Sequence, residues 1–223
     1  MNKVTLEDVK KNQKVQIYIE RANNYLGTIG YTEHGTRHAN LTASIAHNIL
    51  SRIKHNEREA ELAGIAGYLH DIGNIMGRSF HSQSGAILAY NILSEMGMDT
   101  LEIAKIVEAI GTHEVEESGE EPTSETASAL AIADKSDVHR SRVRNPSMTK
   151  FDIHDRVNYA AEHSFLRVNE NEKTMTLEIT IDTKISQVME YFEIFLSRML
   201  ACRKAARILE CEFQLIINNV KLM

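Results

Sequence analysis

Cysteine, proline and tryptophan are scarce in this chain of 223 residues, which has two cysteines, two prolines and no tryptophan. Cys202 and Cys211 are too few for a disulfide framework and their spacing matches no zinc motif, so we expect reduced thiols and a cytoplasmic location. The prolines, Pro122 and Pro146, and only 11 glycines interrupt helices rarely. The sequence therefore predicts a mostly helical protein.

Long apolar runs and an excess of positive charge are also absent. No run approaches the roughly 18 apolar residues of a membrane span, and the N-terminus, MNKVTLEDVKKNQ, lacks the apolar segment of a secretory signal. We therefore expect a soluble protein without a membrane partner. A formal net charge of −6 disfavours nucleic acid as a partner, because polyanion binders are normally basic over their footprint. A small phosphorylated substrate stays compatible, since bound metal ions add positive charge.

Apolar periodicity and capping residues predict six helices in the first 145 residues. On the second of them Leu41, Ile45, Ile49 and Ile53 recur at every fourth position, and His38 is predicted to share their stripe. Residues 114–125 are rich in glutamate, and we expect them to form an exposed loop. The predicted helices cover about residues 5–26, 36–53, 57–71, 82–97, 99–113 and 124–137.

The pattern changes after about residue 145. Two segments, 164–169 and 174–181, alternate apolar and polar residues across a turn-rich link, which predicts a β-hairpin. An amphipathic helix is expected over 185–209 and a third strand over 211–217. The sequence thus predicts a helical domain, residues 1–145, followed by a small α+β region of ββαβ order, residues 146–223.

Four of the ten histidines and two aspartates form a pattern that suits a metal site. Divalent metals that activate water are held by imidazole and carboxylate groups, and several helices must contribute, because one helix presents only positions three or four apart on one face. A His-Asp pair at a helix end can direct both side chains at one point, which places Asp71 well to bridge two metals. The candidate ligands are His38, His70, Asp71, His81, His113 and Asp134, while His34, one turn before His38, is an optional accessory.

The order H…HD…H…H…D resembles the HD superfamily of metal-dependent phosphohydrolases over roughly residues 36–144. The resemblance is carried by His70-Asp-Ile-Gly73, by His81-Ser-Gln-Ser-Gly85-Ala and by Ala133-Asp-Lys-Ser-Asp-Val-His-Arg140. It implies a helical HD-domain bundle. It also implies a first metal on His38, His70, Asp71 and Asp134, and a second on Asp71, His81 and His113.

The two extra histidines make the chain most similar to the two-metal branch of that superfamily, which includes symmetrical dinucleoside tetraphosphate hydrolases. Another group of that branch, the cyclic-dinucleotide phosphodiesterases, carries a GYP motif that this chain lacks, since Glu-Val-Glu-Glu-Ser follows His113. Cyclic dinucleotides are therefore disfavoured as substrates. The ligand set suits iron, manganese, zinc or nickel equally.

We therefore expect a phosphohydrolase that cleaves a phosphoester or phosphoanhydride bond of a nucleotide-like substrate with metal-activated water. Besides Asp71, the residues expected to act in catalysis are Lys135 and Asp137, which would orient substrate or water, and Arg140, which would bind phosphate. Two alternatives remain. The chain could be a non-catalytic, metal-containing nucleotide sensor, or a scaffold whose C-terminal region forms a homodimer or another interaction module.

Overall fold

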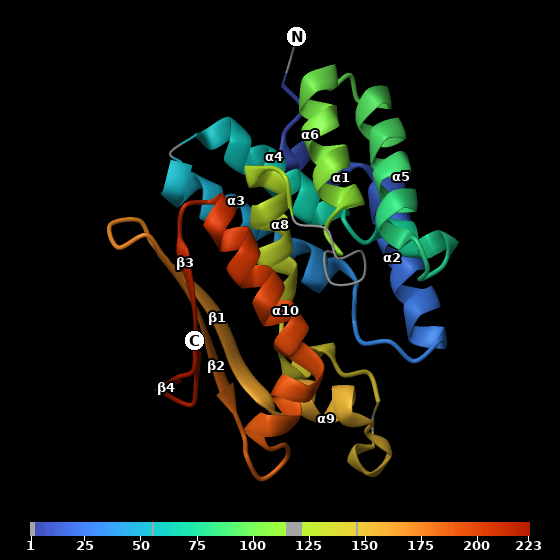
Figure 1. The fold of residues 1–223 in the computed structure, drawn as a ribbon. Coiled ribbons are helices and arrows are strands. Elements are labelled where there is room, and N and C mark those ends of the chain that lie inside the picture. The colour runs from blue at the N-terminus through green and yellow to red at the C-terminus, as the bar shows by residue number, and fades with distance from the viewer. Residues whose placement is uncertain (1–2, 55, 115–121, 146) are drawn as a thin grey trace.

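The computed structural model describes residues 3–54, 56–114, 122–145 and 147–223. A helical body carries a small C-terminal sheet on one side (Figure 1). The predicted fold class, mostly helical with a small C-terminal α+β region, is confirmed. No helix in these ranges is long and apolar enough to cross a membrane. The helices of the body are α1 Leu6–Lys11, α2 Gln13–Thr28, α3 Thr36–Lys54, α4 Glu57–Leu69, the 3-10 helix η1 Ile72–Met76, α5 His81–Glu95, α6 Thr100–Gly111 and α8 Glu125–Lys135.

The first predicted helix, residues 5–26, is in fact two helices. Thr5 and Asp8 form the expected capping box at the start of α1. The backbone then turns extended at Asn12, whose side chain accepts hydrogen bonds from the amides of Lys14 and Val15. Asparagine is a preferred N-cap because its side-chain oxygen satisfies amides that have no partner in the first turn. Asn12 therefore ends α1 and caps the start of a separate helix, α2.

Two further sequence predictions about the body are wrong in detail. The helix predicted over 82–97 begins at His81 and has no side-chain cap, because Phe80 before it is in a left-handed conformation, φ 59°. On α3, Leu41 is 37% exposed, whereas His38, Thr42 and Ile49 are fully buried. His38, Ile49 and Ile53 of the predicted stripe are therefore buried and Leu41 is not, since Ala43 lies at the contact with α4. His38 still lies on the buried face.

Helix α4 lies at the centre of the body and holds one end of the functional site in place. Every residue from Leu62 to Leu69 is buried, and α4 packs against α3, α6 and α8. Gly67 allows the close approach of α3, since a Cβ there would lie 2.9 Å from Ala43 Cα. A helix that is apolar all round is buried all round. The residues that follow α4, His70 and Asp71, are therefore fixed inside the protein.

The C-terminal region forms a four-stranded sheet in the order β1-β2-β3-β4. Strands β1 and β2 are antiparallel, α10 crosses over to a parallel β3, and β4 returns antiparallel to β3. The predicted ββαβ order is present, and a helix before it and a short strand after it were not predicted. The elements are the 3-10 helices η2 Arg140–Arg142 and η3 Met148–Lys150, then α9 Ile153–Ala160, β1 Ala161–Asn169, β2 Thr174–Ile181, α10 Val188–Ile208, β3 Glu212–Ile217 and β4 Val220–Lys221.

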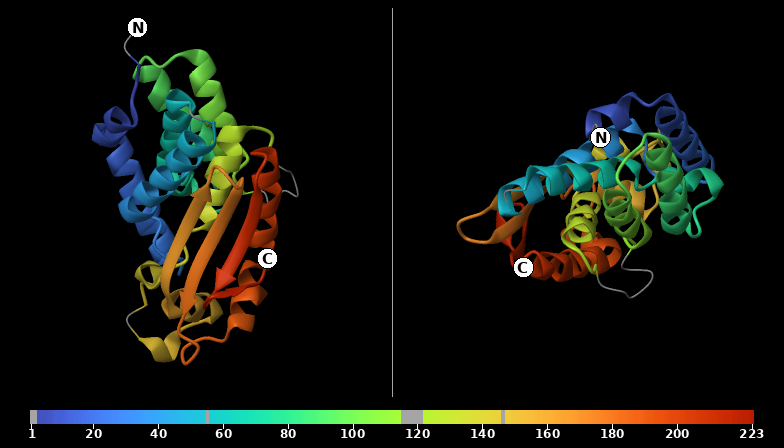
Figure 2. Two further views of the ribbon diagram at one scale, coloured as in Figure 1. Left: turned by 90° about the vertical axis from the view of Figure 1, so that its left-hand side faces the viewer. Right: turned by 90° about the horizontal axis from the view of Figure 1, so that it is seen from above.

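Helix α10 joins the C-terminal region to the helical body. It packs on β3 on one side and on α8 on the other, as the two views of Figure 2 and the front view of Figure 1 show. Tyr191 of α10, Leu177 of β2 and Ile132 of α8 belong to one buried apolar cluster. Because this core runs through both regions, residues of α9 and α10 are held rigidly beside the body.

Gly73 lies where η1 and the start of α5 come closest. A Cβ added to Gly73 would lie 1.9 Å from the carbonyl oxygen of His81 and 2.4 Å from the amide nitrogen of Gly85. Backbone atoms cannot rotate away as a side chain can. Any residue other than glycine therefore pushes η1 and α5 apart, and with them Asp71 and His81.

We predict that Gly73→Ala lowers the free energy of unfolding by about 3 kcal/mol, because the added methyl group overlaps backbone atoms. Gly111→Ala is the matched control, since its Cβ would only reach ordinary contact with Ala86 Cβ at 3.7 Å. The control should change stability by less than about 1 kcal/mol, in the stabilising direction expected for alanine in a helix. Urea unfolding followed by circular dichroism measures both, and equal stability of the two variants would contradict the prediction.

Candidate metal centre

The structure brings all six predicted ligands together from five helices. His38 lies in the first turn of α3, His70 and Asp71 follow the last residue of α4, and His81 is the first residue of α5. His113 follows the end of α6, and Asp134 lies in the last turn of α8. The four histidines and Asp71 are buried, with at most 8% of each residue exposed. The helix ends thus converge on one point inside the protein.

One group of ligand atoms has the dimensions of a metal site. His38 Nε2 lies 3.3 Å from His70 Nε2 and 3.3 Å from Asp134 Oδ1. Asp71 Oδ2 lies 3.1 Å from His70 Nε2 and 3.6 Å from His38 Nε2. Ligands at 2.0–2.2 Å from a cation are about 3.0–3.5 Å from one another in octahedral or tetrahedral arrangements. These four side chains could therefore hold one divalent metal.

A second group shares Asp71 with the first. The Nε2 atoms of His81 and His113 are 3.3 Å apart, and Asp71 Oδ1 is 3.6 Å from His81 Nε2. Glu114 contributes a further carboxylate, since its Oε1 lies 3.4 Å from His81 Nε2. Asp71, His81 and His113 meet the geometric requirement for a metal site, as do His38, His70 and Asp71. Asp71 is the residue common to both groups.

The ring nitrogens facing away from the centre fix the orientation of each histidine. A carbonyl or carboxylate oxygen can only accept, so the nitrogen beside it, Nδ1, carries a proton and Nε2 is left to bind a cation. This arrangement is typical of metal-bound histidines. The Nδ1 partners are Asp137 Oδ2 for His38 at 2.7 Å, Gly67 O for His70 at 2.9 Å, Arg78 O for His81 at 3.0 Å and Ile110 O for His113 at 2.6 Å.

The electrostatics of the centre also favour a bound cation. Burial acts to lower the pKa of His70, but the carboxylates of Asp71 and Asp134 outweigh it and raise this pKa to about 10. Burial acts to raise the pKa of Asp71, yet the neighbouring imidazoles, His70 first, hold it well below its usual range. Asp71 Oδ2 is buried and accepts no hydrogen bond of good geometry from the described residues. A divalent cation would satisfy this oxygen and replace the proton on His70.

The three other residues predicted to act in catalysis lie in different places. Asp137 is buried and contacts His38 rather than the centre of the site. Lys135 lies at the edge of the centre, where its Nζ donates to the carbonyl of His113 at 3.0 Å and lies 3.5 Å from Asp134 Oδ2. The structure does not bring Arg140 to the centre, because its guanidinium pairs with Glu162 at 2.9 Å.

Asp137 is a positioning residue for His38. Its carboxylate accepts hydrogen bonds from His38 Nδ1 at 2.7 Å and from the Arg37 guanidinium at 2.8 and 3.2 Å. Burial acts to raise its pKa, but Arg142, His38 and Arg37 keep the pKa far below the usual range. Asp137 is therefore a permanent anion that holds the ring of His38.

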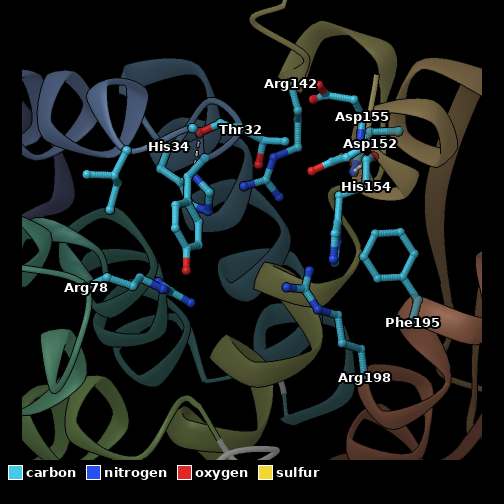
Figure 3. A pocket seen from close by; sticks show the side chains of 13 residues that line it. Thr32, His34, Arg78, Arg142, Asp152, His154, Asp155, Phe195 and Arg198 are labelled. Atoms are coloured by element: carbon cyan, nitrogen blue, oxygen red, sulfur yellow. Dashed lines mark hydrogen bonds between the residues drawn. The ribbon is translucent and has the colours of Figure 1, made fainter. Parts of the chain in front are cut away.

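Other arginines than Arg140 line the centre, and sequence reasoning missed two of them, Arg78 and Arg198. Arg78, Arg142 and Arg198 border both the ligand cluster and an adjoining cavity of about 370 Å³ (Figure 3). His34, considered as an accessory ligand, lines both spaces as well. Arg78 stands three residues before His81, but Arg198 lies in the C-terminal helix, where no motif identifies it. Of the expected acidic loop at 114–125, residues 115–121 lie outside the described residues.

We predict that Asp137→Asn weakens metal binding about 10- to 100-fold, the effect typical of losing a carboxylate that orients a metal-bound histidine. Glu212→Gln, an exposed change on β3, is the control and should bind metal as the wild type does. Isothermal titration calorimetry with manganese measures the metal affinity of both variants. Unchanged affinity in a folded Asp137→Asn protein would remove the positioning role.

The chain is similar to a known protein family, to an uncharacterized protein and to a solved structure. Residues 32–138 match the family model of the HD domain. The chain is 26% identical over 213 residues to the uncharacterized protein MJ1020 of Methanocaldococcus jannaschii, covering 84% of this chain and 81% of that protein. It is also similar to the crystal structure of a predicted HD superfamily hydrolase from an uncultured Thermotogales bacterium. That match has 28% identity, a TM-score of 0.45, and coverage of 57% of this chain and 68% of the other. The segment that matches the HD domain family, residues 32–138, thus contains all six clustered ligands.

Proposed function

We propose that this protein is a metal-dependent phosphohydrolase that acts on a nucleotide-like substrate. An HD domain with its histidines and aspartates gathered at one point supports a metal-dependent hydrolase in general. The observation that carries the finer proposal is the position of three guanidinium groups. Arg78, Arg142 and Arg198 border the space into which the ligand cluster opens. One guanidinium group can donate two parallel hydrogen bonds to two oxygens of a phosphate, so these three arginines suit a phosphorylated substrate.

Two metal ions would be held in the proposed site. His38, His70, Asp71 and Asp134 would bind the first, and Asp71, His81 and His113 the second, with one oxygen of Asp71 on each side. Bound divalent cations lower the pKa of water and neutralise the charge of a phosphoryl group under attack. The chain's own residues hold this arrangement: Asp137 orients His38, and Lys135 balances the charge of Asp134.

A non-catalytic nucleotide sensor is the second candidate function. A sensor has no need of a complete ligand set and would tolerate loss of one or more ligands. All six side chains are present here, and the Nε2 atoms of the four histidines all face the centre. The enzyme is therefore the better proposal. Binding of a nucleotide without any metal-dependent turnover would instead favour the sensor.

Metal content tests the proposed ligand set. We expect two ions per chain at saturation, with the second bound more weakly, because it must displace Arg78, whose guanidinium lies 3.1 Å from His81 Nε2. His113→Gln should remove only the weaker ion, whereas Asp71→Asn should weaken both. Equilibrium dialysis against manganese with elemental analysis gives the counts. His163→Gln, an exposed change on β1, should keep both ions, and two tightly bound ions in Asp71→Asn would refute the shared ligand.

Activity tests the proposed reaction. The manganese-loaded protein should release phosphate from some members of a panel of nucleoside phosphates, dinucleoside polyphosphates and cyclic dinucleotides. Asp71→Ala should lower this turnover at least about a hundredfold, because both metals lose a ligand. Chelation should abolish turnover and manganese should restore it. Equal turnover by wild type and Asp71→Ala would end the metal-centred proposal.

A further inference from the structure

The cavity beside the metal centre is formed jointly by the HD domain and the C-terminal region. Its volume is about 370 Å³, and the loop before α3, the turn after α8, the start of α9 and the middle of α10 all contribute to it. Four of its lining residues also line the ligand cluster: His34, Arg78, Arg142 and Arg198. The cavity therefore adjoins the ligand cluster, and residues of the C-terminal region line it.

The guanidinium groups of three arginines border the cavity and also the ligand cluster. Figure 3 shows those of Arg78, Arg142 and Arg198 directed toward one another across the cavity. Arg78 comes from the segment before α5, Arg142 from η2 and Arg198 from α10. Three separate elements thus bring three positive charges to one place. Such convergence costs electrostatic free energy unless anions balance it. The carboxylate of Glu114 pairs with Arg78 and balances part of this charge.

Arg142 is the most deeply placed of the three. Only 4% of it is exposed. It donates hydrogen bonds to two backbone carbonyls, Asp137 O at 3.0 Å and Glu33 O at 3.2 Å. The carboxylate of Asp137 lies 3.8 Å away and already accepts bonds from Arg37 and His38. The carboxylate of Asp137 is therefore shared among Arg142, Arg37 and His38. Arg142 is thus well suited to bind an additional anion.

The position of Arg198 is fixed by the packing of α10. Tyr191, Phe195 and Met199 on the same helix are buried, and the guanidinium of Arg198 lies over the ring of Phe195 at 5.0 Å from its centroid. A guanidinium held on a packed helix and against a ring loses little conformational freedom when it binds phosphate. Arg198 is thus pre-positioned at the cavity wall.

The opposite wall has the opposite charge. Asp152 and Asp155, at the start of α9, line the far side of the cavity together with His154 and Asn158. In Figure 3, Asp152 and Asp155 lie away from Arg78 and Arg198 but on the same side as Arg142, and the side chain of His154 extends toward Arg198. Carboxylates repel phosphate, so the anionic part of a substrate belongs at the arginine side. The far end suits an uncharged group with hydrogen-bond donors.

We infer that Arg78, Arg142 and Arg198 form a subsite for a second phosphoryl group, next to the one held at the metal centre. This inference rests on the proposed function and specifies its substrate class: a phosphoanhydride, with at least two linked phosphoryl groups, rather than a phosphomonoester. A single phosphoryl group neutralised by the metals would not need three arginines beyond them. Hydrolysis would add one water, break the bond between the attacked phosphorus and the bridging oxygen, release one proton, and leave the second phosphoryl group with the arginines.

Binding measurements on Arg198 test the subsite. Calorimetry on manganese-loaded protein, in a fixed excess of manganese, compares adenosine 5′-monophosphate with the non-hydrolysable α,β-methylene analogue of adenosine 5′-diphosphate. We expect the wild type to bind the diphosphate analogue at least about tenfold more tightly, as a charge-assisted contact to one more phosphoryl group would give. Arg198→Met should reduce this ratio to about twofold or less. Arg198→Lys should restore part of it, since lysine keeps the charge without the paired geometry.

The control is Arg203→Met, which removes an exposed arginine from the same helix and should keep the wild-type ratio. A wild-type ratio below about twofold, no binding of either compound, or an Arg198→Met protein that keeps the full ratio would overturn the subsite. Failure of the proposed function looks different. If no phosphate compound is hydrolysed but the ratio depends on Arg198, the hydrolase proposal fails and the subsite stands.

Discussion

The site depends on one electrostatic constraint, the close approach of imidazole Nε2 atoms that face one another. His38 and His70 bring their Nε2 atoms to 3.3 Å, as do His81 and His113, while the Nδ1 atoms are turned toward oxygens. Two lone pairs at this distance repel unless a proton or a cation lies between them. Asp71 stands between the two pairs and supplies negative charge to both. The whole arrangement therefore requires positive charge at its centre.

The fold supplies the rigidity that holds these nitrogens together. Helix α4 is buried on every side, Gly67 lets α3 approach it closely, and Gly73 lets α5 begin directly beside η1. Asp137 accepts hydrogen bonds from both Arg37 and His38 Nδ1, and so it holds the ring of His38 in one orientation. Because these contacts involve backbone atoms and buried charges, the ligands cannot relax apart. The repulsion within the centre is thus maintained by packing and is relieved by a bound cation.

The C-terminal region is part of the same physical unit. Its helix α10 lies between the sheet and α8, and one apolar cluster runs through all three. This packing places Arg198 beside the ligand cluster, although the two are far apart along the chain. Sequence reasoning assigned phosphate binding to Arg140, which follows Asp134 closely. The structure instead pairs Arg140 with Glu162 and directs Arg142 into the cavity. In the segment 139–144, which arginine faces inward depends on the conformation of η2.

The sequence by itself determined the fold class, the order of the main helices and the six candidate ligands, because helical periodicity and the spacing of histidines and aspartates are local properties. It did not determine the break at Asn12 or the exposure of Leu41, since a cap and the burial of a single helix residue depend on which neighbours are present. Only the tertiary structure showed that Glu114, Arg78 and Arg198 join the ligands at one cavity. Their convergence comes from packing between distant segments, and no spacing within the chain encodes it.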